Sequence, residues 1–274
     1  MRRITLVLLA TLVAIDASAG PRDFAIHVTR MGGDTATAQP YIDKFLRWLE
    51  AEAHWPAGAS KGALAIARKD AIAFVTATKP GLGILDPALY FELRKAQALT
   101  PILQVESKDL YSSKLHVVVK DPALKSLADL KGKRLWTLLG DSNTYLSKVV
   151  LDGKVDAATY FALKAIPTAL KGVKGVMRAE CDATLLDDDQ LEQAKKLPGG
   201  ADLRIVFTSP ALPPIPVVVF GASLPAADKD AVVKSLTAMC GSPKGADICK
   251  ELHFTRLVPV DAAAFAAAQK RYGD

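Results

Sequence analysis

A run of residues able to form hydrogen bonds lies between a predicted strand and a predicted helix. Within "KGKRLWTLLGDSNTYLSKVVL", Lys131 to Leu151, the residues Ser142, Asn143 and Thr144 stand where the helix begins. The first N–H groups of a helix have no partner inside it and carry partial positive charge, so polar side chains there either cap the helix or help to hold an anionic ligand. One residue suffices as a cap. The surplus predicts ligand contacts by all three residues.

Other hydroxyl and carboxyl groups follow or precede predicted elements in the same way. Thr35 and Thr37 lie in a Gly- and Thr-rich loop after the first predicted strand, and Asp86 comes directly before the helix that Pro87 opens. Each is a candidate ligand contact from the N-terminal part of the chain. Capping of the nearby helix is the alternative explanation for Asp86 and for the threonines.

Aromatic and acidic residues complete the set of candidate binding residues. Tyr111 and Ser112 lie where the chain is expected to cross between two lobes, and Tyr145 stands beside the polar loop, although aromatic residues commonly serve core packing instead. Asp182 precedes a predicted strand in apolar surroundings, where a carboxylate is costly without a partner. We therefore expect Asp182 to bind an amine or a hydroxyl of the ligand.

Catalytic and metal-binding motifs are missing from the sequence. The four histidines are dispersed, and the patterns H-E-x-x-H, C-x-x-C and G-x-S-x-G do not occur. Cys181 beside Asp182 is an imaginable nucleophile, but a buried thiol next to a strand explains it better. The sequence predicts no enzyme, no cofactor and no metal site.

The N-terminus has the pattern of a secretory signal peptide. Arg2 and Arg3 precede a largely apolar run from Ile4 to Ile15, and the small residues of "ASA" end at Ala19, where we expect cleavage. The run is too short to span a membrane, which takes about 20 residues. No cysteine follows the cleavage site to carry a lipid. The pattern predicts a soluble protein of a Gram-negative periplasm.

Composition excludes two further classes of protein. Half of the residues are hydrophobic, so the chain is not disordered. The formal net charge of +6 includes two cations and one anion of the leader, and the remaining basic residues are scattered among acidic ones. Without a basic stripe that includes aromatic residues, nucleic acid is not an expected partner.

The three cysteines predict one disulfide bond. Cys240 and Cys249 flank a Gly/Ser/Pro turn, whereas Cys181 is remote in sequence. An oxidising compartment favours pairing of the two near neighbours, and two buried thiols are the alternative.

Strand-like and helix-like segments alternate along the chain, which is typical of α/β proteins with largely parallel sheets. We expect strands near residues 23–29, 81–85, 101–105, 115–120, 134–137, 160–166, 183–186, 203–208 and 216–220, and helices near 41–53, 69–78, 87–97, 143–151, 167–177, 188–196, 225–239, 245–252 and 261–272. The order predicts a signal peptide over 1–19, a discontinuous lobe over 20–113 and 214–274, and a second lobe over 114–213. Two crossings near 106–114 and 210–216 then form a hinge.

Several segments resemble the periplasmic substrate-binding proteins of ABC transporters, in the phosphate/phosphonate-binding branch of the type 2 fold. They are "SLADLKGKRLW" (126–136), "RAECDATLLDD" (178–188), "FTSPALPPIPVVVF" (207–220) and "SLPAADKDAVVKSL" (223–236). The resemblance implies two lobes, each with a mostly parallel sheet flanked by helices, around a ligand cleft. It implies a monomer that delivers a small molecule to an ABC transporter permease.

The chain departs from this family at the polar loop. Family members with phosphonate ligands carry a Ser-Thr-Ser-Gly-like loop, where this chain has Ser142-Asn143-Thr144-Tyr145. The hydroxyls are retained, but a tyrosine replaces the glycine. We therefore predict a small organic or oxyanion ligand, phosphonate-like, gripped by Ser142 and Thr144 and packed on tyrosine. A periplasmic carrier or sensor of an apolar ligand such as a lipid is the alternative, and a periplasmic hydrolase is a further one.

Overall fold

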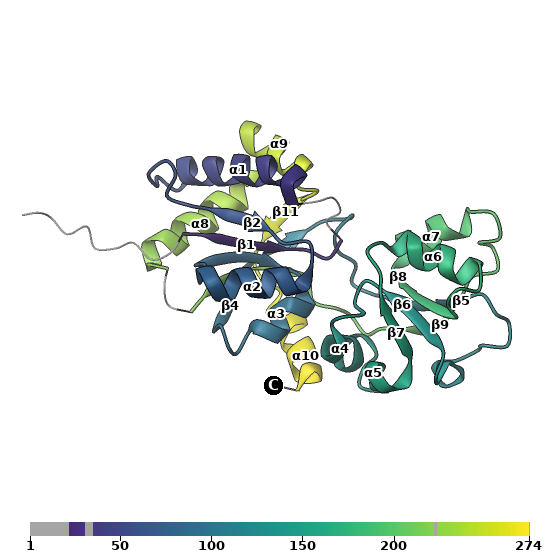
Figure 1. Cartoon of the computed structure of the whole chain (residues 1–274). Coiled ribbons are helices and arrows are strands. Elements are labelled where there is room, and N and C mark those ends of the chain that lie inside the picture. The colour runs from purple at the N-terminus through teal and green to yellow at the C-terminus, as the bar shows by residue number, and fades with distance from the viewer. Residues whose placement is uncertain (1–21, 31–34, 222–223, 274) are drawn as a thin grey trace, which may run out of the picture.

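The chain forms two lobes, each built on its own β-sheet (Figure 1). The computed structural model describes residues 22–30, 35–221 and 224–273, so the predicted signal peptide lies outside the described residues. Within them, no helix is both long enough and apolar enough to cross a membrane.

Lobe 1 contains a six-stranded sheet with the strand order β11-β4-β10-β3-β1-β2. One face, bearing Phe24 and Ile26, packs on α1, α8 and α9, while the other, bearing Ala25, packs on α2 and α3. The strands are β1 (Phe24–His27), β2 (Gly62–Leu64), β3 (Leu82–Leu85), β4 (Leu99–Glu106), β10 (Ile215–Phe220) and β11 (Arg256–Val258). The helices are α1 (Thr35–Glu52), α2 (Arg68–Thr78), α3 (Pro87–Leu93), α8 (Ala226–Met239), α9 (Pro243–Glu251) and α10 (Ala262–Tyr272).

Lobe 2 contains a five-stranded sheet with the order β7-β6-β8-β5-β9. Val118 and Leu186 on one face pack against α6 and α7. The strands are β5 (His116–Val119), β6 (Arg134–Thr137), β7 (Ala162–Ala165), β8 (Ala183–Leu186) and β9 (Arg204–Thr208). The helical segments are η1 (Leu127–Leu130), α4 (Asn143–Tyr145), η2 (Leu146–Val150), α5 (Ala157–Tyr160), α6 (Ala169–Met177) and α7 (Asp188–Lys195).

Both sheets are mixed, whereas mostly parallel sheets were expected. β1 pairs in parallel with β2 and β3, and β6 with β7 and β8. β10 and β5, the strands next to the crossings, pair antiparallel with both of their neighbours. The reason is topological. β4 leaves lobe 1 where β10 enters it, and β5 enters lobe 2 where β9 leaves it. Because the crossings are extended and no helix lies between these strands to reverse the chain, each pair is antiparallel.

Two extended crossings join the lobes, as predicted. The first runs through residues 107–115 between β4 and β5, and the second through 209–214 between β9 and β10. They are hydrogen-bonded to each other, because Ser209 N donates to Leu115 O and Leu212 N donates to Ser113 O, both at 2.8 Å. The Tyr111 hydroxyl adds a bond of 2.6 Å to Leu212 O.

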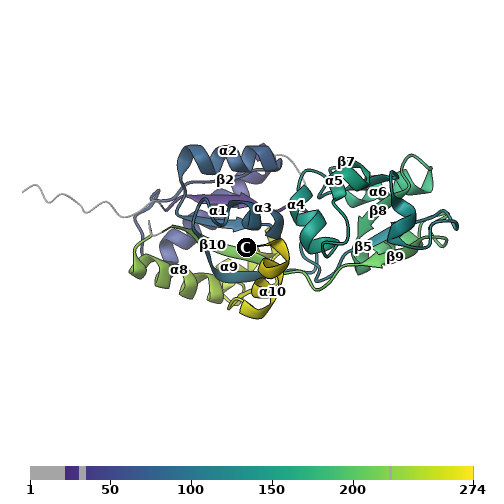
Figure 2. The same ribbon diagram turned by 90° about the horizontal axis from the view of Figure 1, so that it is seen from below.

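The C-terminal helix α10 lies between the lobes beside α4 in both views (Figures 1 and 2). One apolar cluster runs through this contact from lobe 1 into lobe 2. The Phe91 ring stacks on the Tyr145 ring of lobe 2, with centroids 6.0 Å apart, and on the Tyr272 ring of α10, at 5.3 Å. The two lobes therefore share core packing on this side.

Two helix predictions differ from the structure. Helix α1 begins at Thr35 and includes Pro40, although residues 31–40 were expected to form a loop. Burial of Ile42, Phe45 and Leu49 on one face outweighs the cost of a proline near the helix start. The helix after the polar loop is a short α4 followed by a π-helical turn, in which Leu151 N donates to Leu146 O.

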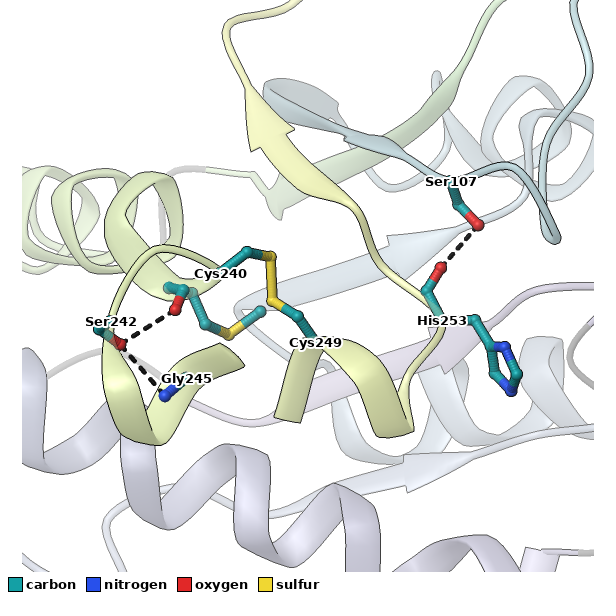
Figure 3. The surroundings of a disulfide bond; sticks show 7 residues. Ser107, Cys240, Ser242, Gly245, Cys249 and His253 are labelled. Carbon is teal, nitrogen blue, oxygen red and sulfur yellow. Dashed lines mark hydrogen bonds between the residues drawn. A yellow bond between two sulfur atoms is a disulfide. The ribbon is translucent and has the colours of Figure 1, made fainter. Parts of the chain in front are cut away.

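The predicted disulfide is present, with the Cys240 and Cys249 sulfurs 2.02 Å apart (Figure 3). It joins the C-terminus of α8 to α9 across the turn at Ser242. The Ser242 hydroxyl accepts from Gly245 N at 3.1 Å and donates to Met239 O at 3.0 Å. Cys181 is a free, buried cysteine.

Candidate functional site

Two adjoining cavities occupy the cleft between the lobes. The larger has a volume of about 620 Å³ and is lined by polar and apolar residues of both lobes. The smaller, about 100 Å³, lies beside the two crossings and is lined mainly by leucine, proline, isoleucine and tyrosine side chains. Four residues border both cavities: Thr29, Arg30, Leu138 and Gln190. The two therefore form one site with a polar and an apolar part.

Ser142 lines the larger cavity and stands at the start of α4, as the sequence predicted. The residue is only 6% exposed, and no described residue forms a hydrogen bond with its hydroxyl. Because the hydroxyl has no partner within the described residues and the residue lines the cavity, this group is free to bond to a ligand. Helix α2 also starts at this cavity, after Ala67, and no side chain caps its first N–H groups. Both features suit a ligand oxygen.

Gly140 permits the close packing that places Ser142. A Cβ atom at this position would lie 2.4 Å from the backbone nitrogen of Ala165 at the end of β7. Any side chain would push the polar loop away from the sheet. The glycine that the family carries after the hydroxyl residues is replaced here by Tyr145. Gly140, which precedes them, instead allows the backbone of the loop to approach β7 closely.

Arg30 joins the lobes across the cleft. It follows β1 in lobe 1, and its Nη1 atom lies 2.5 Å from Oδ2 of Asp187 in lobe 2. Asp187 caps α7, accepting from Gln190 N at 2.7 Å, and its side chain is 3% exposed. Among the described residues, Asp187 is the only polar partner of Arg30. The other N–H donors of the guanidinium are thus free at the border of the two cavities.

A buried network supports the lobe 1 wall of the site. His27 donates from Nδ1 to Ala65 O at 2.8 Å, and its Nε2 lies 3.4 Å from Asp86 Oδ2. The Thr29 hydroxyl also donates to Asp86 Oδ2, while Leu89 N donates to Asp86 Oδ1 at 2.8 Å. Asp86 therefore caps α3, which was its alternative explanation, and it also lines the smaller cavity.

Tyr111, Ser112 and Tyr145 line the smaller cavity, so the structure brings these three predicted residues together. Burial raises the pKa of Tyr111 to about 12. Burial, followed by the negative charge of Asp86, also raises the pKa of Tyr145 well above its usual range. Both side chains are therefore neutral phenols, able to donate a hydrogen bond. The Tyr145 hydroxyl has no hydrogen-bond partner among the described residues.

Asp182 lies at the wrong end of lobe 2 to contact a ligand in the cleft. It precedes β8 and is held by Arg134 at the start of β6, with Arg134 N at 2.8 Å and Nε at 3.1 Å. Since β6 and β8 are parallel, their starts lie together, and their ends at Thr137 and Asp187 face the cleft. The hydrogen bonds from Arg134 outweigh burial and lower the pKa of Asp182. The partner of this carboxylate is therefore Arg134, whereas an amine or a hydroxyl of the ligand was expected.

Three more predicted residues, Asn143, Thr144 and Thr37, line neither cavity. Asn143 and Thr144 are exposed on α4, because the helix turns them away from the cleft. Thr37 is exposed on α1. Thr35 is the first residue of α1, and its side chain lies outside the described part of the chain.

The surroundings of Cys181 do not favour the hydrolase alternative. Burial raises the pKa of the Cys181 thiol to about 12, with the negative charge of Asp182 adding to the effect. This group is a poor nucleophile at neutral pH. Within the described residues, no three His, Cys, Asp or Glu side chains form a metal-binding group.

Sequence reasoning overlooked Arg30, Asp187 and Gln190. A signal for them was present, because Arg30 follows β1 and Asp187 follows β8, and ligands of open α/β sheets bind beyond the carboxyl ends of strands. The pairing of Arg30 with Asp187 had no such signal, since the residues are far apart in the chain.

Comparison with protein families gives one match. Residues 65–265 match the family described as the periplasmic substrate-binding protein of phosphonate ABC transporters. No curated protein sequence matches the chain.

Solved structures with the same architecture come from several bacteria. XAC2383 from Xanthomonas citri, bound to ATP, is 13% identical with a TM-score of 0.71, covering 93% of this chain and 96% of its own. A binding protein component of an ABC phosphonate transporter from Pseudomonas aeruginosa is 12% identical, with a TM-score of 0.64 and coverages of 93% and 88%. PhnD1 from Prochlorococcus marinus, in complex with methylphosphonate, is 13% identical, with a TM-score of 0.60 and coverages of 92% and 95%. At these identities the likeness shows the fold.

Proposed function

Because this chain belongs to the family of periplasmic substrate-binding proteins of phosphonate ABC transporters, we propose that it captures a small organic oxyanion, phosphonate-like, in the cleft. The observation that carries the proposal is Ser142, a little-exposed residue that lines the polar cavity and whose hydroxyl has no described partner. Arg30 and the uncapped start of α2 add N–H donors around the same space. A tetrahedral oxyanion satisfies several such donors at once.

The proposal includes transport and location. The chain delivers its ligand to an ABC transporter permease and acts as a monomer in the periplasm, after removal of residues 1–19. It catalyses no reaction. Residues 20–113 with 214–274 and residues 114–213 are the units that rotate about the two crossings. An acyl lipid fits poorly, because the apolar cavity measures only about 100 Å³.

The affinity of Ser142 variants tests the grip on the anion. We expect Ser142→Ala to weaken binding of methylphosphonate by roughly 1 to 3 kcal/mol in calorimetry, because a desolvated ligand oxygen loses its donor. Thr144→Ala is the matched control, since it removes a neighbouring hydroxyl that lines neither cavity. It should leave the affinity within about twofold, which is inside the usual range for surface substitutions.

The choice of ligands separates the proposed function from its alternatives. The panel contains methylphosphonate, inorganic phosphate, methanesulfonate and a set of lysophospholipids. Binding of a small oxyanion that weakens in Ser142→Ala supports the proposal. Tight binding of a lipid, unchanged by that substitution, would instead establish the apolar carrier.

A further inference from the structure

The smaller cavity is built unlike the polar one. Its walls are Val28 of lobe 1, leucines of lobe 2 such as Leu139 and Leu185, and Leu212 of the second crossing. All of these are buried or partly buried side chains of the core. The cavity thus lies at the base of the cleft, where both lobes and the hinge meet. We call it the base chamber.

Two features of the base chamber select what can occupy it. An engineered apolar cavity of about 150 Å³ binds benzene, so about 100 Å³ accommodates roughly four carbon atoms. Polar side chains such as Asp86, Tyr111 and Thr137 also line the chamber, and these have hydrogen-bond partners in the protein. The Tyr145 hydroxyl differs, because no described residue bonds to it although the residue is 4% exposed. An occupant with an oxygen atom would satisfy this donor.

We propose that the base chamber holds the substituent of the bound oxyanion and selects short alkyl groups of about two to four carbons, with a terminal hydroxyl or carbonyl oxygen that accepts from Tyr145. Arg30 borders both cavities, so it places the charged head in the larger one while the substituent points to the hinge. The inference rests on the proposed function, since it assigns the other half of the same ligand. Inorganic phosphate has no substituent and leaves the chamber empty, whereas a long alkyl substituent exceeds the volume of the chamber.

A series of alkylphosphonates tests the length limit by calorimetry. Affinity should rise at least fivefold from methyl to propyl and fall at least tenfold from butyl to octyl. Leu139→Ala, which enlarges the chamber at a partly buried position, should move the optimum to a longer chain. A steady rise through octyl, or an optimum that Leu139→Ala leaves in place, would overturn the length limit.

The role of Tyr145 is tested with ligands of equal length. 3-Hydroxypropylphosphonate should bind wild type at least fivefold more tightly than butylphosphonate, and Tyr145→Phe should abolish that preference. Tyr160→Phe is the control, because its hydroxyl bonds to Leu127 O and Ala128 O at 3.2 Å, outside the cavities. Equal preference in wild type and Tyr145→Phe would contradict the assignment, as would tighter binding of 2-aminoethylphosphonate than of either compound.

Two further arms separate this inference from the proposed function. The same alkyl substituents are also tested on carboxylates and sulfonates. If the ligand is not a phosphonate, these series still measure the chain length that binds best. If no oxyanion binds at all, the proposed function fails. Crystals of the unliganded protein under xenon pressure then probe the chamber alone. Xenon beside Tyr145 and Leu185 supports an apolar chamber, whereas a continuous chain of ordered waters without xenon would overturn it.

Discussion

Single side chains in this protein owe their behaviour to partners that come from other elements. Glu50 of α1 is a buried carboxylate that accepts from Ser60 N and Ser60 Oγ, both at 2.7 Å, and from Gly58 N at 3.0 Å, and it pairs with Arg47 at 2.9 Å. Burial alone would raise its pKa. The hydrogen bonds and the Arg47 charge outweigh burial, so the pKa of Glu50 is lowered.

The lowered pKa of Glu50 predicts a pH-dependent stability. The folded protein binds the proton of Glu50 more weakly than the unfolded chain does. The stabilisation from ionised Glu50 is therefore complete above the pKa of Glu50 in the unfolded chain, near 4.3. It is lost as the pH falls through the pKa of Glu50 in the folded protein. Glu50→Gln should lower the free energy of unfolding by roughly 1 to 3 kcal/mol at pH 7, and by less at pH 3.5. Urea unfolding at both values measures the difference.

Glu192→Gln is the control for this prediction. Glu192 forms an exposed pair with Lys196 at 3.2 Å, and such pairs contribute little. An equal loss of stability in Glu50→Gln at pH 7 and pH 3.5 would show that packing, and not ionisation, explains the effect.

At the scale of the elements, α9 depends on covalent and polar links to its neighbours. The disulfide joins α9 to α8. The turn after α9 is hydrogen-bonded to the start of the first crossing, where Ser107 Oγ donates to His253 O at 2.7 Å (Figure 3). Thr255 N donates to Glu106 O at 2.8 Å in the same place. The end of β4, where the hinge begins, is therefore tied to α9.

Removing the disulfide should destabilise lobe 1 by a limited amount. Closing a loop of nine residues contributes about 2 to 3 kcal/mol in the chain-entropy model, so Cys240→Ala with Cys249→Ala should lower the free energy of unfolding by that much. Reductant should lower the stability of wild type by a similar amount and leave the double variant unchanged. Three alkylated thiols in protein purified without reductant would rule the bond out.

On the scale of the whole molecule, the Arg30–Asp187 pair predicts that the cleft closes partly without ligand. Asp187→Asn keeps the helix cap, since asparagine caps as well as aspartate does, but it removes the charge that faces Arg30 across the cleft. Losing about 1 kcal/mol of attraction shifts the ratio of open to closed molecules about fivefold. Small-angle scattering of the unliganded variant should show a larger radius of gyration than wild type.

Asp188→Asn is the matched control for closure. Asp188 is the next residue in the chain, but it pairs with His116 of its own lobe, Oδ1 to Nε2 at 2.9 Å. Its scattering curve should equal that of wild type. Identical curves for Asp187→Asn and wild type would mean that the ion pair does not hold the lobes together.

The sequence by itself determined what depends on neighbours along the chain. Short apolar runs located most strands, the polar loop before a helix located Ser142, and the sequence separation of nine between Cys240 and Cys249 located the disulfide. The two-lobed fold followed from the order of these elements together with the family resemblance.

Only the tertiary structure decided which side chains share the cleft. Asp182 and Asp187 are five residues apart, yet they lie at opposite ends of β8, so one meets Arg134 and the other meets Arg30. Thr144 is two residues from Ser142, but the helix directs it to solvent. The base chamber forms from both lobes and the hinge. Such contacts depend on strand direction, helix rotation and lobe packing, which join residues distant in sequence and leave no local pattern.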